Sequence, residues 1–324
     1  MTKLEPSPLN EGELVLTGGV ILHWTSWAPV IMGVVNASPE SFSDGGRYPN
    51  LASQVRAALQ LRDEGANIVD VGGESGVTGI APLGPAEERA RVIPLVRALV
   101  AEGINTSVDT WKRDVAVAAL DAGATLINDV SGLADPAIAQ ACGEAGAGLV
   151  IMHTRARPKH KDFPHSSVRE ATSDVPLFLA DRIAEAERQG LSRRNIIVDP
   201  GPDFGKTPAQ TVAVLRDLGR LQELRCPVLL AVSRKDFIGA ITETRPMDRL
   251  PGTLAAISAG LSRGAAILRV HDVAATRAYL AVRAALGDEG VIDEDLRLPM
   301  ELRRQDPLQP AGANSTTTKG PANQ

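Results

Sequence analysis

Eight short apolar runs recur along the chain, and this repeat constrains the fold more than any other feature. Each run is followed by a polar or glycine-rich turn and then by a segment rich in Ala, Leu, Arg and Glu. The runs are VIMGVV (30–35), NIVDVG (67–72), INTSVD (104–109), TLINDV (125–130), GLVIMH (148–153), NIIVDP (195–200), PVLLAV (227–232) and AAILRV (265–270). Continuous apolar character is typical of parallel strands that are covered on both faces.

Helical patterns separate these runs, for example at 51–66 and 181–191. Eight strand–helix units over about 250 residues match the size of a (β/α)8 TIM barrel, an α/β fold. A doubly wound open sheet has the same local signature, so periodicity alone does not exclude it. The number of units favours the barrel.

Both ends of the chain fall outside the repeat. Residues 12–24 have the pattern of a β-hairpin that turns at Gly18 and Gly19, and we expect it to cover the bottom of the barrel. Residues 306–324 are small, polar and contain proline, which is typical of a disordered tail. The expected parts are an N-terminal segment with the hairpin (1–27), the barrel (28–287) and a C-terminal extension (288–324).

The composition is that of a soluble globular protein, with 44% hydrophobic and 23% charged residues. The net charge of −5 comes without a long basic run, so we expect no nucleic-acid interface. No stretch stays apolar for the roughly 18 residues of a membrane span, and residues 1–13 lack the apolar core of a signal peptide. These features predict a cytoplasmic protein, in which Cys142 and Cys226 are buried thiols.

The ends of the apolar runs carry side chains that can form hydrogen bonds or bear charge. They are Asn36, Asp70 with Glu74, Asp109, Asn128 with Asp129, His153, Asp199, Ser233 with Lys235, and Arg269 with His271. In a barrel these positions converge on the C-terminal rim, where active sites are built. One Asp after a strand is usually a turn former or helix cap, but eight polar ends in one chain indicate a site. The long connection at 154–172 is expected to be a mobile loop at that site.

Asp109, Asn128 and Asp199 provide two carboxylates and one amide among these strand ends. Carboxylates accept hydrogen bonds, whereas an amide both donates and accepts them. The set therefore suits a heterocycle that carries amino, ring N–H and carbonyl groups, and Lys235 adds a cationic donor.

Arg269 and His271 lie two residues apart, so their side chains project to the same side of a strand. They can converge on an anion such as phosphate; a buried structural pair is the alternative. Asn36 could supply a neutral oxygen to a magnesium ion (Mg2+) that carries the oxygens of that anion.

Several longer stretches resemble those of the dihydropteroate synthase family, over roughly residues 28–285. VNASPESFSDGG (35–46) is similar to the first loop of the family, and SVDTWKRDVAVAALDAGATLINDVSG (107–132) to its central strands. VDPGPDFGKT (198–207), VSRKDFIG (232–239), GTLAA (252–256) and LRVHDV (268–273) complete the series in order. The resemblance implies a (β/α)8 barrel, often dimeric, that joins a hydroxymethyl-dihydropterin diphosphate to an aromatic amine in folate biosynthesis.

The resemblance also implies roles for individual residues. The pterin-binding residues would be Asp109, Asn128, Met152, Asp199, Phe204, Lys235 and Arg269. The diphosphate would be held by Asn36, Arg269 and His271, with Asn36 as the Mg2+ ligand. The residues taken as catalytic are Asp109, Asp199, Lys235 and Asn36.

The mechanism implied by the resemblance begins with the departure of diphosphate, which leaves a pterin cation at the exocyclic carbon for the amine to attack. Asp109 and Asp199 would stabilise that cation electrostatically. No strong general base is required, because the leaving group is already a stable anion. The first loop would close over the site through Phe42 and Asp44.

The chain departs from the family on the side of the amine acceptor. The second loop of the family usually reads Gly-Gly-Glu-Ser-Thr-Arg-Pro-Gly, whereas here it is GGESGVTG (72–79), with Gly76 and Val77 at the Thr and Arg positions. Asp236 stands where the family has the serine that receives the p-aminobenzoate carboxylate. The predicted acceptor pocket consists of Phe42, Gly76, Val77 and Asp236.

A carboxylate at position 236 would repel the carboxylate of p-aminobenzoate. Two unit charges about 4 Å apart repel by about 1 kcal/mol in bulk water and by roughly 4 kcal/mol at an effective dielectric constant of 20. Asp is also a good helix N-cap, so a structural role for Asp236 is the alternative.

Because only the acceptor side departs, we expect a transferase that uses p-aminobenzoate or a related amine. One alternative is a paralogue of specialised metabolism with an acceptor other than p-aminobenzoate, and another is a non-catalytic pterin-binding protein. A methyltetrahydrofolate-dependent corrinoid methyltransferase would share the barrel and the Asp/Asn clamp. Its chemistry holds no diphosphate, so Asn36, Arg269 and His271 argue against it.

Overall fold

The computed structural model describes residues 11–37, 50–74, 81–160, 162–164, 167–287, 292–299 and 302. The chain divides into two compact units, Met1–Ala284 and Ala285–Gln324, and everything that follows concerns the first. The expected disordered tail at 306–324 lies outside the described residues. No helix in the described ranges has the length and apolar character needed to cross a lipid bilayer.

The first unit is a closed barrel whose strands follow the order β10-β3-β4-β5-β6-β7-β8-β9, all parallel. The strands are β3 (Val30–Asn36), β4 (Ile68–Gly72), β5 (Thr106–Asp109), β6 (Leu126–Asp129), β7 (Gly148–Met152), β8 (Ile196–Asp199), β9 (Val228–Leu230) and β10 (Ala265–Val270). Each overlaps one of the eight apolar runs, so the predicted (β/α)8 barrel is confirmed. The alternative prediction of a doubly wound open sheet is wrong.

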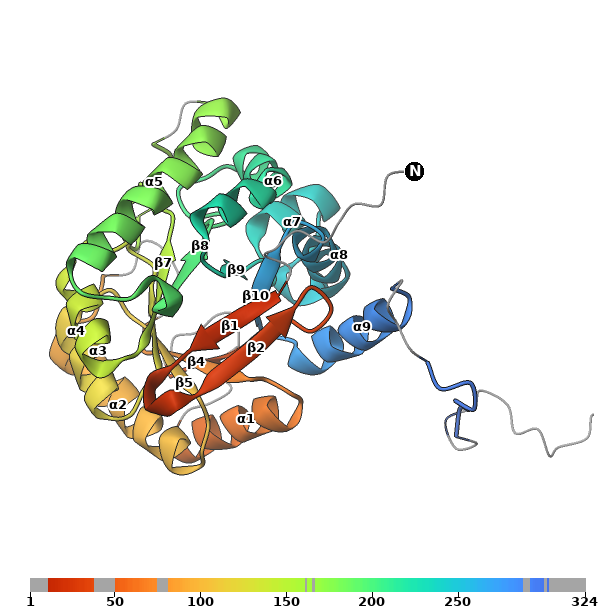
Figure 1. Ribbon diagram of the computed structural model, residues 1–324, viewed down its shortest axis with the longest axis horizontal. Helices are drawn as coiled ribbons and strands as arrows, with labels where there is room; N and C mark the ends of the chain where they lie inside the picture. The colour runs from red at the N-terminus through yellow and green to blue at the C-terminus, as the bar shows by residue number, and fades with distance from the viewer. Residues whose placement is uncertain are drawn as a thin grey trace, which may run out of the picture. The chain divides into compact units, whose positions relative to one another are not determined.

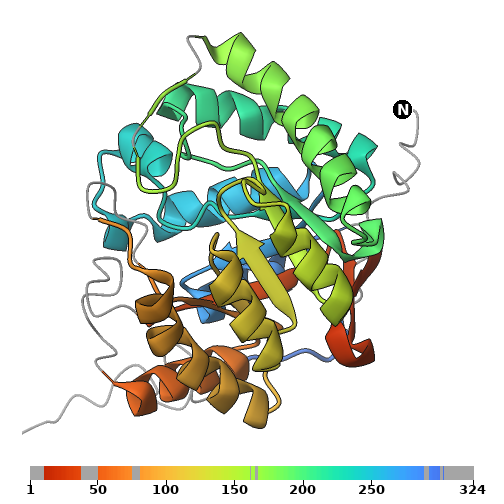
Figure 2. The ribbon, with the colours of Figure 1, turned by 90° about the vertical axis from the view of Figure 1, so that its left-hand side faces the viewer.

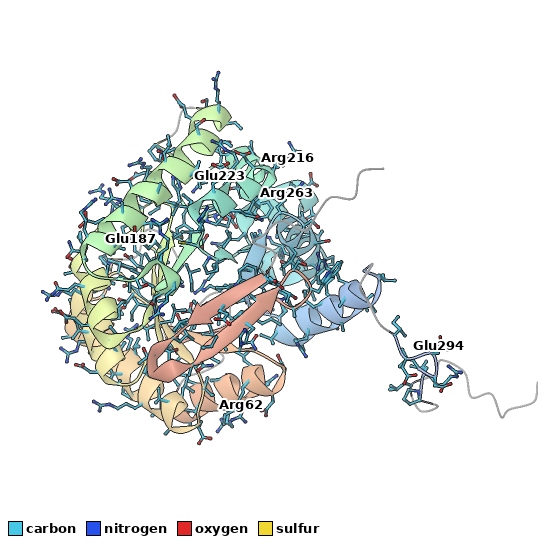
Figure 3. All side chains as sticks on the ribbon, viewed as in Figure 1. Arg62, Glu187, Arg216, Glu223, Arg263 and Glu294 are labelled. Atoms are coloured by element: carbon cyan, nitrogen blue, oxygen red, sulfur yellow. The ribbon has the colours of Figure 1, made fainter. Side chains whose placement is uncertain are left out.

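Helices surround the barrel on its outside (Figure 1 and Figure 2). They are α1 (Leu51–Asp63), α2 (Pro85–Ala101), α3 (Arg113–Asp121), α4 (Ala137–Ala145), α5 (Val168–Arg188), α6 (Pro208–Arg216), α7 (Asp236–Thr242), α8 (Leu250–Leu261) and α9 (Val273–Ala285). Short 3-10 turns lie at η1 (Thr17–Gly19), η2 (Arg193–Asn195), η3 (Leu218–Leu224) and η4 (Pro246–Asp248). Exposed charged side chains such as Arg62 and Glu187 mark the outer faces of this helical ring (Figure 3).

The local sequence explains where α5 begins. Ser167 is the N-cap: its side chain accepts a hydrogen bond from the backbone N–H of Glu170, and the Glu170 carboxylate accepts one from the backbone N–H of Ser167. This capping box starts the helix at Val168. The connection predicted at 154–172 therefore ends at residue 167, and its last five predicted residues belong to α5.

The N-terminal hairpin closes the bottom of the barrel, as predicted. β1 (Glu11–Val15) pairs antiparallel with β2 (Ile21–Thr25), and η1 turns the chain between them. Leu14, Leu16 and Trp24 are buried in a cluster with side chains from the first halves of the barrel strands. The Asn195 amide, just before β8, donates to the carbonyl of Val15 at 2.9 Å. Figure 1 shows the hairpin, in red, lying across the end of the barrel.

Alternation along the strands fills the barrel interior from an apolar bottom to a polar top. The inner apolar cluster contains Val30, Met32, Ile68, Leu126, Val150, Ile197, Leu229 and Ile267, together with the hairpin side chains. Successive residues of a strand point to opposite faces, so a residue two positions further points inward again. Two positions after each of these inner apolar residues stands a candidate site residue. The pairs are Ile68 and Asp70, Leu126 and Asn128, Val150 and Met152, Ile197 and Asp199, and Ile267 and Arg269. The candidate site thus rests on the inner core.

Candidate active site

The strand register places the ends of four adjacent strands in one row, in which Asn36, Asp109 and Asn128 are predicted site residues. Asn36 of β3 lies opposite Gly72 of β4, Gly72 opposite Asp109 of β5, and Asp109 opposite Asn128 of β6. Met152 and Asp199 form the corresponding pair on β7 and β8. The row runs along the C-terminal ends of the strands, which is where the sequence predicted a site.

Arg269 connects Asp109 of this row with Asp70, which lies two residues before Gly72 on β4. Its Nε lies 2.7 Å from Oδ2 of Asp70, and its Nη2 lies 2.9 Å from Oδ2 of Asp109. The Asn128 amide donates to the same Asp70 oxygen at 3.1 Å. Asp70 is fully buried and its Oδ1 has no hydrogen-bond partner within the described structure. Arg269 and His271 are both half-buried. They contact different residues, because Nδ1 of His271 lies 3.0 Å from Oγ of Ser233.

Burial perturbs the ionisation of Asp109 and Arg269. It raises the pKa of Asp109 to about 7; Arg269 opposes this rise, whereas the nearby Asp70 carboxylate adds to it. Burial lowers the pKa of Arg269, but Asp70 and Asp109 outweigh it, so the net shift is upward and the guanidinium stays charged. Asp109 therefore sits beside a permanent cation while close to its own titration point at neutral pH.

Asp199 and Lys235 lie on the next part of the rim. Asp199 is 3% exposed and accepts a hydrogen bond from the backbone N–H of Gly201 at 2.7 Å. Burial raises the pKa of Asp199 and lowers the pKa of Lys235, although the carboxylates of Asp203 and Asp199 act against the second shift. The Lys235 ammonium lies 4.2 Å from the centroid of the Phe204 ring, a cation–π contact.

A cavity of about 590 Å³ opens above these residues. Its lining includes Asp109, Trp111, Phe204, Arg234, Lys235 and Asp236. The buried residues Asn128, Met152 and Asp199 belong to the same strand ends. Of the predicted heterocycle-binding residues, Asp109, Phe204 and Lys235 line this cavity, whereas Asn128, Met152 and Asp199 lie at neighbouring strand ends and are not part of its lining.

A network of charged side chains holds the base of the second loop, and the sequence prediction did not find it. The Lys112 ammonium pairs with the carboxylates of Glu74, at 2.6 Å, and Glu88. Lys159 pairs with the other Glu74 oxygen at 3.2 Å, and the backbone N–H of Leu83 donates to it at 3.0 Å. These side chains are 12% exposed or less. Their ion pairs join the connections that follow β4, β5 and β7 at the rim.

Lys206 is a second residue that the sequence prediction missed. It is 2% exposed and its ammonium donates to the carbonyls of Gly201 at 2.8 Å, Phe204 at 3.1 Å and His153 at 3.3 Å. Burial lowers the pKa of Lys206 to about 7. The lysine thereby fixes the turn that follows Asp199, which the sequence DFGK (203–206) could have indicated only as a turn.

The acceptor-pocket prediction is described only at Asp236. Phe42, Asp44, Gly76 and Val77 lie outside the described residues. Asp236 is the first residue of α7, and the N-cap is Lys235, so the alternative that Asp236 is an N-cap is wrong. Its side chain is 77% exposed and pairs with Arg249 at 2.9 Å. The repulsion argument assumed that the Asp236 carboxylate carries an unpaired charge, whereas the structure pairs it with Arg249.

The sequence and the fold match known proteins over most of the chain. The profile of the family described as pterin binding enzyme matches residues 32–271. The dihydropteroate synthase of Bacillus subtilis (strain 168) is 39% identical over 246 residues, which cover 75% of this chain and 84% of the relative. That of Mycobacterium leprae (strain TN) is 40% identical over 268 residues, covering 80% and 94%.

Solved structures agree with these relatives. The Xanthomonas albilineans dihydropteroate synthase with 4-aminobenzoic acid matches with a TM-score of 0.77 and 41% identity, covering 85% of this chain and 98% of that one. The same enzyme in complex with 7,8-dihydropteroate matches with a TM-score of 0.74 and 40% identity over the same shares. The chain therefore belongs to the pterin-binding enzyme family and, within it, to the dihydropteroate synthases.

Proposed function

We infer that this chain is a dihydropteroate synthase, a transferase that condenses 6-hydroxymethyl-7,8-dihydropterin diphosphate with p-aminobenzoate and releases diphosphate. The observation that carries this function is the position of Asp109, Asn128 and Asp199 at the C-terminal ends of the barrel strands, with Arg269 bridging Asp70 and Asp109. The relatives named above support the p-aminobenzoate enzyme rather than a paralogue with another acceptor or a non-catalytic pterin-binding protein.

We propose that the pterin lies against the strand ends. Asp109 and Asp199 accept hydrogen bonds from its amino and ring N–H groups, and Asn128 provides the amide that pairs with its polar edge. Lys235, already held over Phe204, donates to the ring from the side of α7. Met152 is 1% exposed and supplies an apolar surface below the ring.

The chemical step breaks the bond between the exocyclic carbon and the diphosphate oxygen, and the electron pair leaves with the diphosphate. The nitrogen of the amine then forms the new C–N bond and loses a proton. Asp109 and Asp199 stabilise the cation formed between these events, because Asp199 is buried and Asp109 is half-buried, so water screens their charges less than at the surface. Arg269 and His271 face the leaving group.

We propose that Asn36 is the protein ligand of a Mg2+ ion. Asn36 is the last residue of β3 and lies opposite Gly72 of β4, at the C-terminal end of the strands. Among the described residues no three His, Cys, Asp or Glu side chains gather as a metal site. This fits Mg2+, which keeps several waters and binds through few protein oxygens plus substrate phosphates. When bound, the ion neutralises charge on the diphosphate.

The remaining expectations are proposals that follow from the family resemblance. We propose that the chain acts in the cytoplasm as a homodimer, which light scattering after size exclusion would test. We also propose that Phe42 and Asp44 close over the site, and that Gly76 and Val77 border the acceptor.

Product mass tests the function directly. The protein is incubated with the pterin diphosphate, Mg2+ and p-aminobenzoate, and we expect 7,8-dihydropteroate and one diphosphate per product. Asp109→Asn, which keeps the side-chain shape, should lower kcat/KM by about 100-fold or more, whereas Asp217→Asn in an exposed pair with Arg220 should not. Pterin binding without diphosphate release with any amine would contradict the proposal.

A further inference from the structure

Arg249 holds a fixed position across α7, beside the cavity wall. Its side chain is only 11% exposed. The guanidinium donates from Nε to the carbonyl of Thr244 at 3.1 Å, and from Nη1 to the carbonyl of Arg234 at 2.9 Å and to Oδ1 of Asp236 at 2.9 Å. Two backbone carbonyls therefore anchor the arginine independently of the carboxylate.

Gly239 makes this position possible. A Cβ atom built at Gly239 would collide with Nη2, Cζ and Nε of Arg249. Any other residue at position 239 would force the guanidinium away from α7. The glycine, the two carbonyls and Asp236 thus define one place for the positive charge.

Two other charged side chains at this corner of the cavity have partners of their own. Arg234 binds Asp272 through two contacts of 3.1 and 2.7 Å. The Asp203 carboxylate accepts the backbone N–H of Phe237 at 3.2 Å. Asp236, at 77% exposure, is the carboxylate of this corner that is open to solvent. Arg249 is therefore the group that decides whether Asp236 presents a net negative charge to the cavity.

We infer that Arg249 is a specificity-determining residue that neutralises Asp236, so that the cavity accepts amines with a carboxylate. This rests on the proposed function. Without Arg249, the Asp236 charge would repel an anionic acceptor about 4 Å away, a penalty of roughly fivefold in affinity in bulk water and more where water is excluded. Without Asp236, the anchored guanidinium would face the acceptor alone and attract an anion.

The test compares p-aminobenzoate with p-aminobenzamide, which has nearly the same shape and no charge. The measured quantity is the ratio of kcat/KM for the charged amine to that for the uncharged amine. We expect Asp236→Asn to raise this ratio at least fivefold and Arg249→Gln to lower it at least fivefold. The double variant should return close to the wild-type ratio, because neither charge is then present.

Two controls separate charge from structure. Arg249→Lys keeps the charge and should stay closer to wild type than Arg249→Gln. Asp217→Asn removes the carboxylate just before η3 from its pair with Arg220, which has a similar length and lies outside the cavity lining, and should leave the ratio unchanged. If Arg249→Gln fails to fold, Asp236→Asn and Asp236→Lys still decide the question. An unchanged ratio in both would overturn the inference.

Calorimetry separates this inference from the function on which it rests. The same proteins are titrated with both amines in the presence of 6-hydroxymethylpterin and diphosphate, so that the ratio of Kd values is read without turnover. A wild-type protein that makes no product but shows the expected ratios would contradict the proposed function alone. An active enzyme whose ratio of Kd values stays the same in Asp236→Asn and in Arg249→Gln would contradict the role of Arg249 alone.

Discussion

Replacing Asp70 by alanine removes the carboxylate that Arg269 and Asn128 share. Hydrogen bonds to a charged group contribute about 1.5–3 kcal/mol each, and Asp70 accepts two of them. Removing one partner of a buried ion pair costs about 3–5 kcal/mol, because the other charge stays buried. Both routes predict that Asp70→Ala lowers the free energy of unfolding by about 3–5 kcal/mol, out of the 5–15 kcal/mol typical of a domain.

Urea unfolding followed by circular dichroism at pH 8 measures this loss. Asp70→Asn keeps a carbonyl oxygen for Arg269 but no charge, so it should lose less than Asp70→Ala. The KM for the pterin diphosphate should rise more than the KM for the amine, because Arg269 and Asn128 lose their anchor. The exposed pair of Asp63 with Arg62 is the control, and Asp63→Ala should cost no more than about 1 kcal/mol. An Asp70→Ala variant within about 1 kcal/mol of wild type would refute this reasoning.

Three further predictions follow from the same contacts. The pKa of Asp109 is about 7 in the folded protein against an ordinary value of 3.8, so the folded state binds the extra proton between these values. The free energy of unfolding should therefore fall as pH rises from about 4 to about 7, and urea titrations should find this component missing in Asp109→Asn. Lys112→Met leaves the buried Glu74 carboxylate without its 2.6 Å partner and should cost about 3–5 kcal/mol by the same measurement, with Lys112→Arg closer to wild type. Gly201 has φ +63° and a Cβ there would strike the His153 carbonyl oxygen, so Gly201→Ala should lose more than the roughly 1–2 kcal/mol of the left-handed backbone alone, seen as a lower Tm.

The barrel could be predicted because each strand is covered on both faces and must be apolar along its length. β10 coincides with its predicted run, and the hairpin turns where Gly18 and Gly19 predicted it. β9 is shorter than its run: the ladder ends at Leu230, while the buried residues 231 and 232 continue the apolar pattern beyond it. Burial therefore predicts the existence of a strand better than its end.

The pairing of charges at the rim could not be predicted in the same way. Arg269 and Asp70 are 199 positions apart, and only barrel closure brings β10 and β4 to opposite sides of β3. Glu88 lies in the first turn of α2, where a glutamate is usually exposed, yet it is fully buried because it faces Lys112. The sequence identifies the residue types at strand ends, whereas their partners depend on how the loops fold back.

The hairpin at the bottom of the barrel also bears on the order in which substrates would bind at the top. Within the described part of the barrel, the N-terminal end is closed by the hairpin side chains Leu14, Leu16 and Trp24, and packed side chains fill the interior above them. In the binding mode proposed above, substrates would approach from the opposite, C-terminal end of the barrel. A pterin bound on the strand ends, as we propose, would lie beneath the amine, so this binding mode predicts that the pterin binds first and the amine second.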